Sequence, residues 1–171
     1  MHRLAVLALL LIPATPLARA DPVTLVQLRE AFARQGADAL EMAEQNGEPA
    51  LSGEMLGQPF EATLSACNGP EPACSVVAYR ACRDLPDHSR IEALEIANTY
   101  NQEDSKAVLF AEEEWFGQAL CVRLLQDLRM AGPFGARQAS DWQIELEDFL
   151  QTVDTALADK QAANGLDNGT P

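Results

Sequence analysis

The sequence predicts an α+β protein built on one antiparallel five-stranded sheet, with its elements in the order αβββαββα. Three observations predict this class. Strand-like segments follow one another in runs, joined by short turns rich in Gly, Asn and Pro. Helical segments do not alternate with single strands, as a doubly wound nucleotide-binding fold requires. Each predicted helix also opens with a recognisable capping sequence. Runs of adjacent strands favour antiparallel pairing, with helices covering one face of the sheet.

Three helices are predicted, at about residues 25–35, 89–101 and 140–158. Each begins with a capping box, in which Ser or Thr is followed three residues later by Glu or Gln. These pairs are Thr24–Gln27, Ser89–Glu92 and Ser140–Gln143. The last helix has the clearest apolar stripe, which begins at Trp142 and recurs at helical spacing.

Five strands are predicted between these helices, and they are bounded by turn residues. The segment 60–67 alternates most clearly between apolar and polar residues, which is typical of a half-buried strand. Residues 38–44 are expected to form only a short extended entry before the turn at 45–47. The five strands are 50–56, 60–67, 74–83, 106–111 and 115–125.

The first twenty residues resemble a secretory signal peptide. His2 and Arg3 give the segment a basic start. An unbroken apolar run then covers residues 4–12, and small residues lie at positions 18 and 20. Cleavage is expected between Ala20 and Asp21. The alternative is an uncleaved anchor, but a run of about nine residues is too short for a bilayer, which needs ~20. We therefore expect a periplasmic or secreted protein that does not insert into the membrane after cleavage.

The remaining chain has the length of a single domain, expected at 21–160, followed by a polar tail at 161–171 that is expected to be disordered. Cleavage would leave 10 basic against 26 acidic residues, a formal charge of −16. This charge disfavours nucleic acid, whose recognition depends on Lys and Arg contacts. It favours cationic partners, although solubility alone is an alternative explanation.

The sequence contains few of the residues and motifs that are typical of catalytic sites. His88 is the only histidine after the signal peptide, and no nucleophile-elbow, phosphate-loop or dinucleotide motif is present. The cluster of Asp84, Asp87 and His88 could be an acid–base or metal site, but it also fits ordinary chemistry at a helix start. We therefore expect a protein that is not an enzyme, without catalytic residues, cofactor or metal.

Four cysteines remain after cleavage, and they allow three pairings. No C-x-x-C motif is present, so a thioredoxin-type redox site is poorly supported, and export permits disulfides. Cys67 ends one predicted strand and Cys74 begins the next, so the two lie opposite each other across a hairpin. A reactive thiol pair is the alternative, but it requires an electropositive setting that this acidic chain scarcely provides.

Several segments resemble the YbjN-domain family, which is similar in fold to the class I chaperones of type III secretion. They are the run 57–60 (Gly-Gln-Pro-Phe), the cysteine hairpin, the helix end 96–101 (Ile-Ala-Asn-Thr-Tyr-Asn), and the two strands and amphipathic helix that follow. The resemblance covers about residues 25–157. It implies the αβββαββα order, a homodimer, and the family's label of sensory-transduction regulator, with no associated reaction.

The chain departs from the family at two places. Its helix end reads Asn98-Thr99-Tyr100-Asn101, where many members are closer to N-x-W-N, and Cys82 and Cys121 are additions. The secretion-chaperone fold implies that the third and fifth strands are neighbours. That arrangement would place Cys82 and Cys121 together on the more polar sheet face, and a second disulfide is expected there.

Four residues are candidates for contact with a partner. Asn98 and Asn101 share a helix face, either as amides that contact a ligand or as helix-end residues that bond backbone groups. Trp115 and Phe116 are adjacent on a strand and face opposite sides. One would pack under the last helix, and the other would lie in a groove or dimer interface, or would simply be exposed on the half-covered sheet.

These observations predict a non-catalytic, exported protein of the bacterial envelope with a chaperone-like or regulatory function. It would bind an extended or amphipathic peptide segment on the uncovered sheet face or in an apolar groove. The alternative is an acidic inhibitor or stress factor that binds cationic envelope proteins. An enzyme built on paired carboxylates is a third possibility, and it would need a pocket with perturbed carboxyl pKa values.

Overall fold

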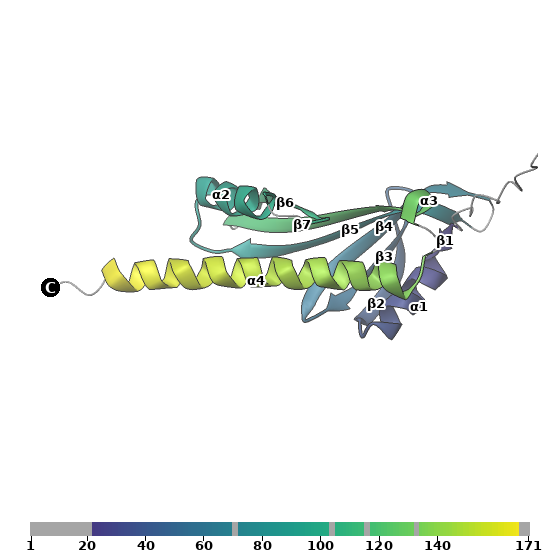
Figure 1. The fold of residues 1–171 in the computed structure, drawn as a ribbon, viewed down its shortest axis with the longest axis horizontal. Coiled ribbons are helices and arrows are strands. Elements are labelled where there is room, and N and C mark those ends of the chain that lie inside the picture. Colours follow the sequence, from purple (N-terminus) through teal and green to yellow (C-terminus); the bar gives the residue numbers. More distant parts are fainter. Residues whose placement is uncertain (1–21, 70–71, 103–104, 115–116, 132–133, 168–171) are drawn as a thin grey trace, which may run out of the picture.

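A computed structural model describes residues 22–69, 72–102, 105–114, 117–131 and 134–167. It shows an α+β architecture with one antiparallel sheet, and α4 runs along the length of that sheet (Figure 1). The strands are β1 (Val23–Thr24), β2 (Asp38–Gln45), β3 (Glu48–Met55), β4 (Gln58–Asn68), β5 (Ala73–Leu85), β6 (Val108–Glu114) and β7 (Gly117–Asp127). The helices are α1 (Leu25–Arg34), α2 (Arg90–Tyr100), α3 (Leu128–Ala131) and α4 (Ala136–Asp167).

The sheet has seven strands, in the order β2-β3-β4-β5-β7-β6, with β1 paired to β5. The predicted count of five is therefore wrong. The first additional strand, β1, is only two residues long. The second, β2, is exposed at nearly every position, so it shows no alternation of buried and polar residues that could reveal it in the sequence. The predicted adjacency of the third and fifth strands is confirmed, because β5 pairs with β7 over ten residue pairs, from Val76↔Asp127 to Leu85↔Gln118.

Two of the three predicted helix starts are confirmed. Thr24 and Ser89 each accept a hydrogen bond from the backbone three residues on, and the side chains of Gln27 and Glu92 bond back to the caps. The predicted start at Ser140 is wrong, because α4 begins at Ala136. Its first turn is capped differently, since the Gln138 side chain accepts a bond of 2.9 Å from the Gly135 N–H.

The far end of α4 also differs from the expected end at residue 158. The helix continues to Asp167, so residues 161–167 of the segment expected to be disordered are helical. The last turns of α4 extend beyond the ends of β5 and β7 (Figure 1). None of the described helices is both long enough and apolar enough to cross a membrane.

One hydrophobic core joins the sheet to α1, α2 and α4. Alternation along β5 directs Val77, Tyr79 and Ala81 into this core, and α4 contributes Trp142 at its centre. The Trp142 ring stacks on Tyr79 with centroids 5.3 Å apart, and Phe60 and Phe32 continue the aromatic contacts toward α1. Truncating a fully buried aromatic side chain of this kind typically costs about 3–5 kcal/mol. The position and tilt of α4 on the sheet are therefore strongly determined.

Two disulfides connect neighbouring strands, and both expected pairings are confirmed. Cys67 bonds to Cys74 across the β4–β5 hairpin, and Cys82 bonds to Cys121 between β5 and β7. In each case the partners lie directly opposite each other in the strand register. Stable structural disulfides are a feature of oxidising compartments, so this chain belongs in a non-cytoplasmic environment.

Candidate functional site

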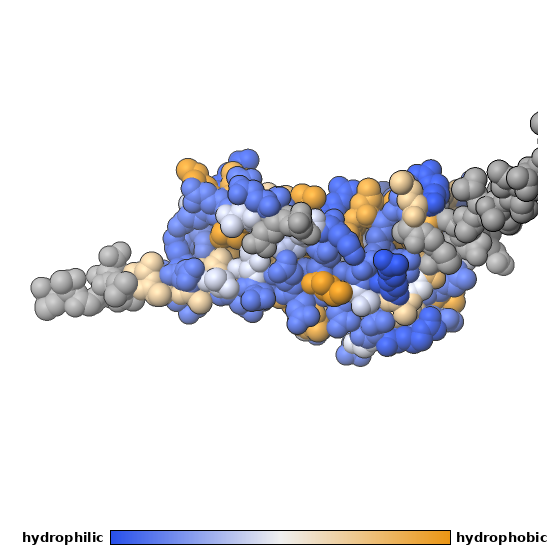
Figure 2. All heavy atoms as spheres, in the orientation of Figure 1, coloured by the Kyte–Doolittle hydropathy of each residue, from blue (hydrophilic) through white to orange (hydrophobic). Residues whose placement is uncertain are grey.

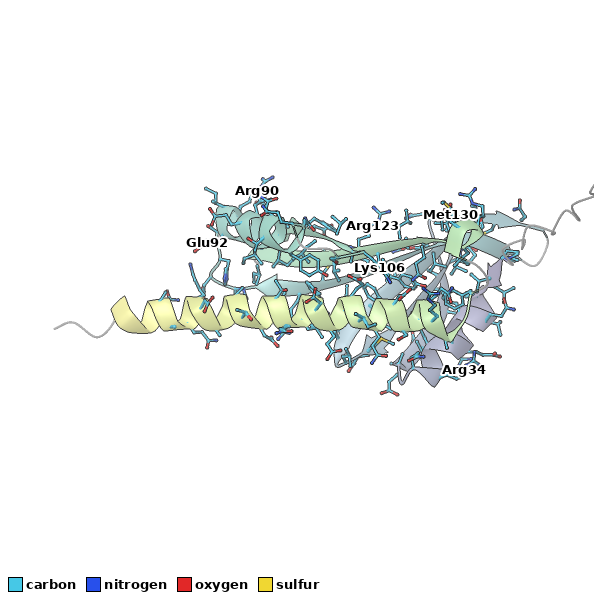
Figure 3. All side chains as sticks on the ribbon, viewed as in Figure 1. Arg34, Arg90, Glu92, Lys106, Arg123 and Met130 are labelled. Carbon is cyan, nitrogen blue, oxygen red and sulfur yellow. A yellow bond between two sulfur atoms is a disulfide. The ribbon has the colours of Figure 1, made fainter. Side chains whose placement is uncertain are left out.

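The face of the sheet opposite the core carries no helix among the described residues. Alternation along β6 buries Leu109 while directing Val108, Phe110 and Glu112 to this open face. The same alternation on β7 directs Arg123 and Leu125 there, and Figure 3 shows Arg123 on the side of the sheet away from α4. We call this surface the open face.

An apolar hollow of about 480 Å³ lies at the β6–β7 end of the open face. Val108 and Leu125 are 57% and 59% exposed, which is high for aliphatic residues in a sheet. Two basic side chains rim the hollow. Lys106 is engaged with Asp141 of α4 at 3.0 Å, whereas Arg123 has no ion pair among the residues that the structure describes. The hollow is lined by Lys106, Val108, Phe110, Arg123 and Leu125.

A second, polar hollow of about 360 Å³ continues from the first toward β4 and shares Phe110 and Arg123 with it. Arg80 forms an ion pair with Glu112 across it, and the Arg80 guanidinium also lies 3.8 Å from the Cys121 sulfur. The Cys82–Cys121 disulfide thus forms part of the open face, on the same side as Arg80, as its register predicts. Together, the two hollows form an elongated surface with one apolar end and one polar end.

Metal binding does not suit this surface. Cys82, Cys121 and Glu112 are the one group of three potential ligands that lie together within the described ranges. The two sulfurs are bonded to each other, and Glu112 is paired with Arg80, whose positive charge opposes a cation. These residues therefore do not fit a metal ion.

The two asparagines predicted to share a site have different environments. Asn101 at the C-terminus of α2 donates to the Leu109 carbonyl at 2.7 Å and accepts from the Leu109 N–H at 2.8 Å. Its amide thereby pairs with the free edge of β6, as a neighbouring strand would. Asn98 is exposed and shares its helix face with Ile91 and Leu94, which are 70% and 41% exposed. Asn101 thus has a structural function, and Asn98 belongs to an accessible surface.

Four further predicted positions lie outside the described residues. These are the candidate interface pair Trp115 and Phe116, and the expected cleavage site at Ala20 and Asp21. The sequence did not identify three informative residues of the open face, which are Val108, Arg123 and Leu125. Residues 107–111 are a continuous apolar run, so they do not distinguish the two faces of β6, and only the pairing of β6 with β7 brings Leu125 beside Val108 and Phe110.

A buried carboxylate links α4 to the segment before β6. Glu145 is 7% exposed and accepts hydrogen bonds from the Ser105 hydroxyl at 2.6 Å and from the backbone N–H groups of Lys106 and Ala107. The Tyr100 hydroxyl of α2 lies 3.5 Å from the same carboxylate. Because these donors satisfy the buried carboxylate, Glu145 holds the β6 edge against α4 and α2.

Burial raises the pKa of two tyrosines in the core. The pKa of Tyr79 is raised well above its usual range by burial, with a further contribution from the nearby negative charge of Asp141. Burial likewise raises the pKa of Tyr100 to about 12. Both phenols therefore stay protonated at neutral pH and act as hydrogen-bonding core residues. Tyr79 donates to Gln126 at 3.0 Å.

Figure 2 shows hydrophilic side chains over most of the face in view, with hydrophobic side chains scattered among them. Neither a protein-family model nor a curated protein matches this chain.

Proposed function

We propose that this protein is an exported, non-catalytic binding protein of the bacterial envelope, with a chaperone-like or regulatory function. It holds a segment of another envelope protein on its open face. The observation that carries the proposal is the apolar hollow around Val108 and Leu125, set on a sheet whose other face packs against the core. Exposed aliphatic residues on a half-covered sheet mark interaction surfaces, since their burial by a partner is favourable.

The open face also indicates the chemistry of the bound segment. Apolar side chains of the partner would enter the hollow, and a carboxylate next to them would meet Arg123, which has no ion pair among the described residues. A segment with alternating apolar and polar side chains matches the pleat of the sheet beneath it. The expected signal peptide and the two disulfides support binding in the periplasm or outside the cell.

Site-specific photo-crosslinking in the living cell tests this proposal. A photoreactive residue is placed at Leu125 on the open face or at Ile144 on α4, two positions that are equally exposed at 59%. We expect one recurrent envelope protein to be captured from position 125 and not from position 144. Equal capture from both positions, or capture from 144 alone, would contradict binding at the open face.

We also propose that the exported chain is a homodimer, as the resemblance to YbjN domains implies. Sedimentation velocity on the oxidised protein checks this, and a monomer at all concentrations would refute it.

A second candidate function is that of an acidic inhibitor or stress factor that binds cationic envelope proteins. The formal charge of −14 for the whole chain supports it, and so does a groove between α2 and α4 where every charged lining residue in the described part of the chain is acidic. Binding to a basic partner should then weaken steeply as salt is raised. A salt-independent affinity would argue against this candidate.

A further inference from the structure

A groove of about 500 Å³ runs between α2 and α4, away from the open face. Its apolar lining includes Ile96 and Tyr100 from α2 and Ala156 from α4. The two helices are joined at the side of the groove by an ion pair in which Lys160 of α4 bonds Glu92 of α2 at 2.7 Å. Figure 3 shows Glu92 on α2 near α4. The Lys160–Glu92 ion pair therefore connects the two helices that form the walls of the groove.

Three carboxylates, Glu95, Asp148 and Asp159, line this groove, and no basic residue among those that the structure describes does so. Their acidic neighbours are neutralised: Glu92 pairs with Lys160, and Asp154 pairs with Arg83. The three lining carboxylates form no ion pair with any residue that the structure describes. The groove thus combines an apolar floor with uncompensated negative charge.

The Tyr100 phenol lies in the groove lining together with Asp148. Burial raises its pKa to about 12, and the negative charges of Glu145 and Asp148 act in the same direction.

The groove is also elongated. Its α4 wall follows one helix face through Asp148, Thr152, Thr155 and Asp159. At 1.5 Å per residue, the two aspartates are separated by about 16 Å along the helix. Carboxylates therefore stand at both ends of a stripe about three turns long, and Glu95 faces them from α2.

The walls of the groove also indicate the conformation of its occupant. Both walls are helices, whose backbone groups are already bonded within each helix, so they offer no edge to which an extended strand could pair. A helix bonds its own backbone groups, so it needs no edge from the groove walls.

We propose that the α2–α4 groove binds an amphipathic helix of a partner protein that carries basic side chains at both ends of an apolar stripe. The apolar side chains would enter the groove over Ile96 and Ala156, and the basic ones would pair with Asp148 and Asp159. This inference rests on the second candidate function, and it names both the site and the class of partner.

Peptide binding tests the assignment. The probe is a synthetic helix-forming peptide with Lys at two positions eleven residues apart and Leu at the intervening groove-facing positions, spaced as on α4. A second peptide has Glu in place of Lys. Affinity is measured by isothermal titration with the oxidised protein, with the groove variant Asp148→Asn/Asp159→Asn, and with a control variant, Glu41→Gln/Glu44→Gln.

The control variant removes the same charge from exposed residues of the edge strand β2. Both variants alter only exposed side chains, and circular dichroism verifies that they are folded. We expect the Lys peptide to bind, the Glu peptide not to bind, the groove variant to weaken the Lys peptide at least tenfold, and the β2 variant to weaken it less than twofold. Equal weakening by both variants would overturn the groove assignment, because it would reflect only the total charge.

Absence of Lys-peptide binding to the wild-type protein would also overturn the groove assignment. The open-face proposal is judged separately, by capture from position 125. Substitution of Leu125 by Asp should leave Lys-peptide affinity unchanged, since Leu125 does not line this groove.

Discussion

The substitution Asn101→Ala tests how the side chain of Asn101 satisfies the backbone groups at the outer edge of β6. The Asn101 amide forms two hydrogen bonds with the Leu109 backbone, at 2.7 and 2.8 Å, and Leu109 is 1% exposed. Removing the amide leaves one buried N–H and one buried C=O without partners, at a cost of about 1–3 kcal/mol each. Asn101 has right-handed helical φ and ψ, so Ala fits this backbone without strain. We therefore expect a loss of about 2–4 kcal/mol, because water can replace part of the bonding.

The assay is urea unfolding of the oxidised protein, followed by tryptophan fluorescence, to which the buried Trp142 contributes. Asn98→Ala is the matched control, since Asn98 is exposed on the same helix and should change stability by less than about 0.5 kcal/mol. Native-state hydrogen exchange should also show that the Leu109 amide loses protection only in the Asn101 variant. Equal stability of the two variants, or a Leu109 amide that stays protected in the Asn101 variant, would refute this explanation of the edge.

Two further predictions concern the disulfides and the α2–α4 ion pair. Replacing both cysteines of the Cys82–Cys121 bond, which closes a sequence separation of 39, should cost about 4 kcal/mol, against about 2.5 kcal/mol for the Cys67–Cys74 bond with a separation of 7. Denaturant midpoints check this order, and a larger loss from the shorter loop would contradict the chain-entropy argument. The bond from Lys160, assisted by the capping bonds with Ser89, lowers the pKa of Glu92 from 4.5 to about 2. Ionised Glu92 therefore favours the folded state above pH 4.5, and this contribution is lost as pH falls toward 2. In thermal unfolding across that range, Lys160→Met should show a smaller acid-dependent loss than the wild type, and identical pH profiles would show that the ion pair contributes nothing.

Local signals in the sequence predicted the elements that depend on neighbouring residues. The capping boxes at Thr24 and Ser89 required only residues three positions apart, and the Cys67–Cys74 bond required only a hairpin. The pairing of Cys82 with Cys121 depended on which strands are neighbours, and that adjacency came from the resemblance to a known fold and not from spacing.

The features missed in the sequence depend on contacts between distant segments. Strand β2 is stabilised by pairing with β3 and not by burial, so its polar pattern resembles a loop. The start of α4 at Ala136 was hidden because Ala139 extends the buried stripe upstream of Trp142 without a strong hydrophobic signal. The open-face hollow and the α2–α4 groove each combine segments that only the fold brings together.

The most direct test of the account is the affinity of the oxidised protein for the partner segment captured from position 125. Leu125→Asp places a charge in the apolar hollow, whereas Ile144→Asp places one on α4 at an equally exposed position. If the open face holds the partner, Leu125→Asp should raise the dissociation constant at least tenfold and Ile144→Asp should leave it unchanged. An unchanged affinity for Leu125→Asp would show that the sheet face is not where the partner is held.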